Sequence, residues 1–147
     1  MAYVLIGGLA ATLWGSPHVT FDVDITPEGD PENLERLSAA LEDLDARIRV
    51  EGEPDGLAFD RSARMLSRAS ILNLMTRAGA LDLCMSPAGS GGYEDLRKDA
   101  AEIEIRGLRI LVASLPHIIR SKEAAGREKD RAVLPSLRRL QGLLETD

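Results

Sequence analysis

The sequence predicts an α+β domain, in which a small mixed sheet carries helices packed against it. Short apolar runs bounded by glycine or polar residues, such as residues 3–6 and 80–85, are typical of buried strands. Leucines recur every three or four residues over 34–44 and 134–144, as they do on the buried face of a helix. The 147 residues show no internal repeat and no linker, so we expect one domain over residues 1–147.

The elements expected in the first half of the chain follow from where glycine and proline interrupt the apolar runs. They are a strand over residues 3–6, a helix over 9–14, a strand over 19–25, and a helix that begins at Pro31. Asp30 is the expected N-cap of that helix, because its carboxylate accepts a hydrogen bond from a free backbone N–H group and proline suits the first helical position. The acidic run EGEPDG that follows predicts a loop over residues 51–56.

The second half predicts two hairpins and four helices. The expected elements are a short helix over residues 60–68 capped by Asp60, strands over 70–75 and 80–85, a loop over 86–92, a short helix from Tyr93 towards residue 101, strands over 102–106 and 108–112, a helix from Ser114 to Ala125, and a last helix from Arg131 to about Leu144. A charged segment over residues 126–130 separates the last two helices.

The composition excludes several classes of protein. With 44% hydrophobic and 29% charged residues, the chain is typical of a globular protein rather than a disordered one. An aromatic content of 3% disfavours stacking platforms for single-stranded nucleic acid, and a net charge of −6 disfavours a protein that coats duplex DNA. The single cysteine, Cys84, lies between apolar residues and excludes an internal disulfide or a Cys-rich zinc site. The apolar residues 1–15 lack a basic leader and are too short to span a bilayer, so we expect a cytoplasmic protein without a membrane partner.

Two aspartates one residue apart, Asp22 and Asp24, are the most informative feature of the chain. On a strand both side chains point to the same face, about 7 Å apart along the chain. Two like charges on one face are unfavourable unless water or a cation neutralises them. Carboxylates at this spacing suit one or two Mg²⁺ ions, and paired ions suit phosphoryl transfer, while the alternative reading is a solvated strand end.

The order of several motifs resembles nucleotidyltransferases with the DNA polymerase β-like fold. Residues 6–8 (IGG) end the first strand, and residues 15–24 (GSPHVTFDVD) lead into the D-x-D strand. Asp82 is placed as the third acid, on a later strand. Residues 121–130 (SKEAAGREKD) match a segment of small bacterial members, among them abortive-infection and type IV toxin–antitoxin nucleotidyltransferases.

This resemblance implies a role for each motif. Asp22, Asp24 and Asp82 would be the catalytic residues that hold two Mg²⁺ ions, and Asp82 would alternatively act as a base for the incoming hydroxyl. The glycine pair would let the backbone and the following helix N-terminus approach the phosphates of an NTP. Further nucleotide contacts are implied at the residues Gly7, Gly8, Ser16, Thr20, Lys122 and Arg127. On one helix, Lys122 and Arg127 would converge on the triphosphate, although the same charges also read as a solvated helix face.

The leading hypothesis is an Mg²⁺-dependent transferase that moves NMP from an NTP to a hydroxyl on a protein or RNA. The implied acceptors include tRNA, and the implied partners include an antitoxin or a second copy of the chain. Two departures from the family pattern keep a second hypothesis open, that of a nucleotide- or partner-binding module without turnover. His18 stands where members often have Arg, and the helix that many members place before the first strand is not seen in this sequence. A third hypothesis is an interaction domain in which all these charges lie on the surface.

Overall fold

The structure is a computed structural model that describes residues 1–146. The strands are β1 (Tyr3–Ile6), β2 (Asp22–Pro27), β3 (Arg47–Val50), β4 (Glu53–Leu57), β5 (Ile71–Thr76), β6 (Gly79–Cys84), β7 (Ala101–Ile105) and β8 (Leu108–Val112). The helices are α1 (Gly7–Trp14), α2 (Pro31–Asp43), α3 (Ala63–Leu66), α4 (Tyr93–Arg97), α5 (Leu115–Ala125) and α6 (Glu128–Glu145). The predicted α+β class is confirmed.

Within residues 1–146, eight strands form one mixed sheet in the order β4-β3-β5-β6-β2-β1-β8-β7. The pairs β1–β2, β3–β4, β3–β5, β5–β6 and β7–β8 are antiparallel, whereas β2–β6 and β1–β8 are parallel. The two parallel pairs bring distant parts of the chain together at the centre of the sheet. There Asp24 of β2 lies opposite Ile6 of β1 on one side and Asp82 of β6 on the other.

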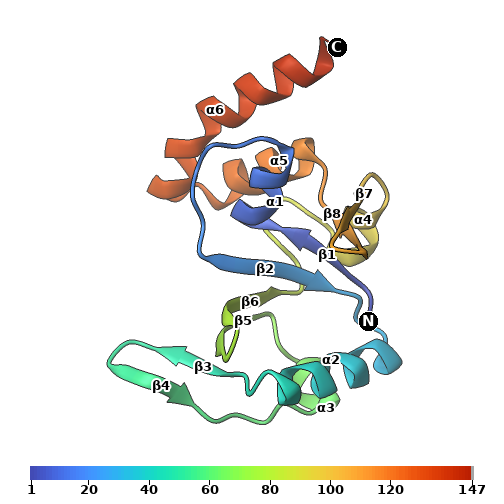
Figure 1. Ribbon diagram of the computed structural model, residues 1–147, viewed down its shortest axis with the longest axis vertical. Helices are drawn as coiled ribbons and strands as arrows, with labels where there is room; N and C mark the ends of the chain where they lie inside the picture. The colour runs from blue at the N-terminus through green and yellow to red at the C-terminus, as the bar shows by residue number, and fades with distance from the viewer. Residues whose placement is uncertain (147) are drawn as a thin grey trace.

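All the helices except α4, which lies beside β7 and β8, form two groups at opposite ends of the molecule (Figure 1). Helices α1, α5 and α6 gather beside β1, and α2 and α3 lie at the end that carries β3 and β4. Trp14 ties α1 to the chain after β8, since its indole N–H donates to the Ala113 carbonyl at 2.8 Å. The core between these elements is aliphatic, and its most completely buried side chains include Leu37, Leu74 and Leu137. Within residues 1–146, no helix is long and apolar enough to cross a membrane.

The prediction of a loop over residues 51–56 is wrong, because most of these residues belong to the hairpin of β3 and β4. Proline is tolerated in β4 since this strand lies at the edge of the sheet. Gly56 adopts a φ of +67°, and a Cβ atom there would lie 2.7 Å from the carbonyl oxygen of Ile48. Gly56 is therefore explained by a close approach of two backbone segments, which only glycine permits, and not by the loop that it predicted.

Several element boundaries also differ from expectation. Helix α1 begins at Gly7, β2 begins only at Asp22, and α4 ends at Arg97. The residues before β2 that were expected in the strand are loop, and Phe21 is 89% exposed. Helix α3 is much shorter than the expected 60–68. Its N-cap is Ser62 rather than Asp60, whose carboxylate instead accepts from the Ser62 N–H at 2.9 Å.

Other expectations about helix ends are confirmed. The Asp30 side chain accepts from the N–H of Asn33 at 3.3 Å, as an N-cap should. Ser114 caps α5 in the same way, through the N–H of His117 at 3.2 Å. The last helix begins earlier than expected, so that the charged residues 128–130 form its first turn.

Candidate active site

One cleft of about 460 Å³ brings the predicted site residues together. It lies where β2 and β6 face α1, α5 and α6, and its size is that of a small-molecule site. Every residue that the sequence predicted for the site lines it: Gly7, Gly8, Ser16, Thr20, Asp22, Asp24, Asp82, Lys122 and Arg127. These residues come from distant parts of the chain, so the fold itself assembles the set.

The centre of the cleft is a pair of carboxylates, Asp24 and Asp82. They occupy opposed positions on neighbouring parallel strands, while Asp22 lies two positions earlier on β2, opposite Ala80. Burial, the hydrogen bond to Asp82 and the negative charges of Asp82 and Asp22 together raise the pKa of Asp24 to about 7, and the positive charge of Lys122 opposes this rise. Near neutral pH, in the absence of a cation, Asp24 is therefore partly protonated, and its proton lies in the hydrogen bond to Asp82.

A divalent cation suits this pair. Within residues 1–146, no group of three or more His, Cys, Asp or Glu side chains is already arranged to hold a metal ion. Asp24 and Asp82 nevertheless offer hard oxygen ligands that hydrogen-bond to each other through one proton, and a cation in place of that proton would relieve their repulsion. The donor set therefore fits Mg²⁺ at Asp24 and Asp82, with Asp22 close enough for its charge to act on Asp24.

Gly7 brings the backbone of the first turn of α1 against Asp24. Its φ is +70°, and an added Cβ atom would overlap the Oδ2 atom of Asp24. The neighbouring Gly8 packs against Thr20, where an added Cβ atom would lie 3.1 Å from the threonine Oγ1. The two glycines thus have different reasons to lack a side chain, and only Gly7 touches the carboxylate pair.

We expect Gly7→Ala to lower the free energy of unfolding by about 1–3 kcal/mol, because alanine is strained at this φ and its methyl group displaces Asp24. Gly8→Ala is the matched control, since its contact with Thr20 needs a shift of only a few tenths of an ångström. Urea denaturation of both variants in EDTA measures the difference. Equal stability of Gly7→Ala and wild type would contradict this account of the turn.

Lys122 and Arg127 form the opposite wall of the cleft, but they do not share a helix as the sequence suggested. Gly126, with a φ of +61°, ends α5, and Arg127 is the N-cap residue of α6. A third residue, Asp130, forms ion pairs with both of these basic side chains. Its carboxylate is 1% exposed, accepts from Arg127 Nε at 2.7 Å, and lies 3.7 Å from Lys122 Nζ.

Electrostatics couple this wall to the carboxylate pair. Burial alone would raise the pKa of Asp130, but the hydrogen bonds and charge of Arg127, with the charge of Lys122, hold that pKa below its ordinary value. The hydrogen bond to Asp130 raises the pKa of Arg127, and the charge of Asp24 adds to the rise. The positively charged side chains of Lys122 and Arg127 are therefore held on the cleft wall, where their charges interact with that of Asp24.

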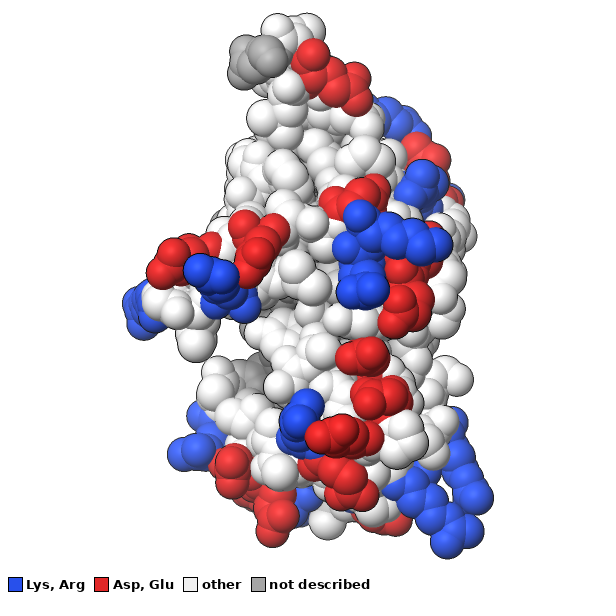
Figure 2. Space-filling model, turned by 90° about the vertical axis from the view of Figure 1, so that its right-hand side faces the viewer, with Lys and Arg blue, Asp and Glu red and all other residues white. Residues whose placement is uncertain are grey.

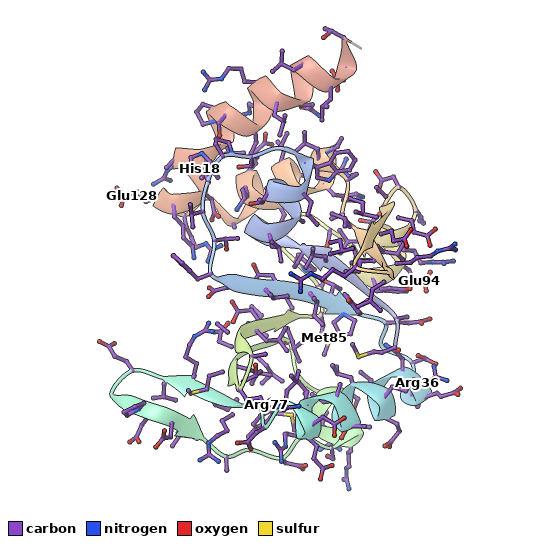
Figure 3. All side chains as sticks on the ribbon, in the orientation of Figure 1. His18, Arg36, Arg77, Met85, Glu94 and Glu128 are labelled. Carbon is purple, nitrogen blue, oxygen red and sulfur yellow. The ribbon has the colours of Figure 1, made fainter. Side chains whose placement is uncertain are left out.

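The remaining predicted residues belong to the loop between α1 and β2. Ser16 is buried, and its hydroxyl accepts from the His18 N–H at 3.4 Å. Thr20 packs on Gly8 and lies 3.5 Å from the Asp22 carbonyl through its Oγ1 atom. Figure 3 shows His18 where this loop passes α6, and its Nε2 atom lies 2.9 Å from Ser136 Oγ. His18 thus connects the loop to the helix.

Three further residues at the cleft or in contact with it were missed by sequence reasoning. Asn73 of β5 lines the cleft opposite Asp82, and Arg49 of β3 donates from Nη2 to Asp82 Oδ1 at 2.7 Å. His117 of α5 also lines it, with Nε2 3.2 Å from Asp99 Oδ1. None of the three lies in a recognisable motif. Asn73 lies on the predicted hairpin of residues 70–85, and only the strand register shows that it faces Asp82. Arg49 lies on β3, a strand that the sequence did not predict.

Opposed aspartates on two central strands, a glycine turn beside them and two basic side chains at α5 and α6 thus lie together in one cleft. The structure is similar to that of the lincosamide antibiotic adenylyltransferase LnuA bound to lincomycin, with a TM-score of 0.57 and 18% sequence identity. The match covers 95% of this chain and 87% of that chain, so the two share a fold over nearly their whole lengths. No protein-family model and no curated protein sequence matches the chain.

Proposed function

We propose that the protein is an Mg²⁺-dependent nucleotidyltransferase that moves NMP from an NTP to an acceptor hydroxyl. The observation that carries this proposal is the pairing of Asp24 with Asp82 in a cleft whose facing wall carries Lys122 and Arg127. Carboxylates suit the cations of a phosphoryl-transfer site, and fixed cations suit a triphosphate. The similarity of the fold to an adenylyltransferase supports the same reading.

The residues divide the work of the reaction. Lys122 and Arg127 would bind the charged phosphates, and the N-terminus of α1 at Gly7 would offer its free N–H groups to them. Asp24 and Asp82, with Asp22, would hold the cations. An Mg²⁺ ion held there would supply charge neutralisation at the phosphates and a lower pKa for the acceptor hydroxyl.

In the proposed step, the acceptor oxygen forms a bond to the α-phosphorus while the bond from that phosphorus to the bridging oxygen breaks. The electron pair leaves with pyrophosphate, and the proton of the hydroxyl passes to solvent water, or to the carboxylate of Asp82 where that residue acts as the base instead of holding a cation. Asp82 suits this role because its side chain is 18% exposed and reaches the cleft from the strand beside Asp24. Positioning and charge neutralisation supply most of the rate in reactions of this kind.

The acceptor defines the biological role, and we propose three classes for test. The sequence motifs support a hydroxyl on a protein or on an RNA such as tRNA, in the setting of a toxin–antitoxin pair with an antitoxin or a second copy of the chain as partner. LnuA, which binds lincomycin, supports a small molecule. On the face that Figure 2 presents, acidic and basic side chains are interspersed, a pattern that gives polyanionic RNA little support there.

Calorimetry with Mg²⁺ and a non-hydrolysable NTP tests nucleotide binding directly. We expect a saturable site, and no binding at millimolar ligand to a folded sample would overturn the proposal. Incubation with each α-labelled NTP and cell lysate then separates labelled protein, RNA and small molecules, and identifies the acceptor class.

A second candidate function is a nucleotide-binding module without turnover. It is favoured by one observation, that Arg49 already pairs with Asp82 where a cation-binding acid is expected. Mn²⁺ binding followed by electron paramagnetic resonance separates the two candidates. A transferase binds Mn²⁺ in a manner that depends on Asp24 and Asp82, whereas a module binds nucleotide equally well with and without the metal.

Lys122→Ala is expected to weaken nucleotide binding about tenfold or more, since a hydrogen bond to a charged group is worth about 1.5–3 kcal/mol. Mn²⁺ binding should stay nearly intact. The Lys122 side chain is only 18% exposed and lies beside Asp130, so its loss should cost about 1 kcal/mol of stability, more than an exposed lysine would. Lys98→Ala, an exposed change outside the cleft, is the control. Equal nucleotide affinity of wild type and Lys122→Ala would remove this wall from the nucleotide site.

A further inference from the structure

A row of polar side chains crosses the sheet from β3 to β2. Asp24 lies opposite Asp82, and Asp82 lies opposite Asn73 on β5. On the next strand Ile48 pairs with Leu74, and this antiparallel register places Arg49 beside Asn73. The row therefore begins at the carboxylate pair and ends at a guanidinium on the side of the sheet away from β1.

Arg49 holds Asp82 from a fixed point. Its Nη1 atom donates to the Leu74 carbonyl at 3.0 Å, and its Nη2 atom donates to Asp82 Oδ1 at 2.7 Å. A guanidinium is planar and rigid, so an anchor at one nitrogen fixes the direction of the other. The bond to Oδ1 therefore fixes the rotation of the Asp82 carboxylate beside Asp24.

The ion pair between Arg49 and Asp82 contributes little to the stability of the fold. The Arg49 side chain is 38% exposed, and ion pairs open to solvent are worth about 0–1 kcal/mol. Arg47 on the same strand shows the contrasting arrangement, because its Nε atom donates to the Asp55 carbonyl within the hairpin at 2.7 Å. Arg49 is the one of these two arginines that reaches across β5 to the carboxylate pair.

We propose that Arg49 is a positioning residue, which orients Asp82 so that Asp24 and Asp82 together bind a divalent cation. This inference rests on the proposed function. Arg49 acts on the carboxylates from β3, whereas Lys122 and Arg127 act on the nucleotide from α5 and α6. The position of Arg49 thus separates cation binding from phosphate binding, and the two can be measured independently.

The test compares Arg49→Met, Arg49→Lys and the matched control Arg47→Met in the full-length protein. Mn²⁺ affinity is measured by electron paramagnetic resonance, and ATP affinity is measured by calorimetry in EDTA. Loss of a group that orients a metal ligand typically costs about 10- to 100-fold in metal affinity, so Arg49→Met should weaken Mn²⁺ binding by that factor. ATP affinity in EDTA should change less than about twofold, because the phosphate-binding wall is untouched, and Arg47→Met should match wild type in both measurements.

Arg49→Lys keeps the charge but loses the two-point contact, so its Mn²⁺ affinity should lie between those of wild type and Arg49→Met. This variant also serves if Arg49→Met fails to fold, which near-ultraviolet circular dichroism would reveal. The role of Arg49 would be overturned, with the proposed function left standing, if Arg49→Met bound Mn²⁺ as tightly as wild type does. If Arg49→Met does not fold, the same result in Arg49→Lys would overturn it. Equal weakening of Mn²⁺ binding in Arg47→Met would overturn it as well. A wild-type protein that binds neither Mn²⁺ nor ATP would overturn the proposed function and this inference with it.

Discussion

Asp24→Asn is expected to lower nucleotidyl transfer by about 10²-fold or more, the scale seen when a major electrostatic stabiliser is lost. Asparagine keeps the shape of the side chain but removes one of the two charges that would hold the cation between β2 and β6. Transfer is measured with a labelled NTP at saturating Mg²⁺. Asp43→Asn, an exposed change on α2, should leave transfer unchanged.

The same substitution should stabilise the metal-free protein at pH 8. The pKa of Asp24 is raised from 3.8 to about 7 in the folded state. Its protonated form therefore favours folding below about pH 4, and this contribution is lost as the pH rises through about 7. Asparagine remains neutral throughout. Because one pKa unit corresponds to about 1.4 kcal/mol and the cleft is partly open to solvent, we expect a gain of about 1–2 kcal/mol.

Urea denaturation in EDTA at pH 5 and pH 8 measures this gain. The advantage of Asp24→Asn over wild type should grow between the two values. If the variant is instead less stable than wild type at pH 8, the carboxylate has a structural role and its assignment to the metal site is wrong.

Asp130→Asn is expected to lower the free energy of unfolding by about 3 kcal/mol, because it removes one partner of a buried ion-pair cluster. The carboxylate is 1% exposed and holds both Arg127 and Lys122. Its pKa is depressed, so the stabilisation is present above the ordinary pKa of an aspartate and is lost as the pH falls through the depressed value. Nucleotide affinity should fall as well, since Lys122 and Arg127 both lose the carboxylate that holds them in place.

Thermal and urea unfolding at pH 7, with calorimetry of ATP binding, check these effects. Glu128→Gln is the matched control, because Glu128 lies exposed in the same turn of α6 and its change removes the same charge (Figure 3). A loss of stability in Asp130→Asn no larger than in the control would show that the buried carboxylate does not hold this wall together.

The sequence predicted the parts of the site that depend on local patterns. The apolar run before Gly7, the alternation around Asp22 and Asp24, and the position of Asp82 on a later strand placed three acids on the correct elements. The opposed pairing of Asp24 with Asp82 needed the structure, since register between strands is set by packing and turn geometry rather than by the strand sequence alone.

The missed features have identifiable physical causes. β4 was taken for a loop because Pro54 and Gly56 are unfavourable inside a strand, yet an edge position and a close backbone approach allow them here. Because that hairpin was not predicted, the position of Arg49 beside Asp82 could not be predicted either. The end of the fifth helix at Ala125 was predicted, but the nucleotide role assumed that Lys122 and Arg127 share one helix. The left-handed Gly126 instead turns the chain and gives Arg127 its place as the N-cap of α6.

The two parallel strand pairs have a consequence for how the protein acquires its site. β1 joins β8 and β2 joins β6, so each pairing closes a long loop of chain before any contact in the cleft can form. Such pairings carry a loop-closure entropy and make folding slower than in proteins dominated by local contacts. The carboxylate pair therefore exists only in the native state, and a ligand that binds there raises the melting temperature by mass action, with a stabilisation that grows as the logarithm of its concentration over its Kd. A shift in melting temperature with Mn²⁺ or nucleotide thus reports binding to the assembled sheet and not to an unfolded or partly folded chain.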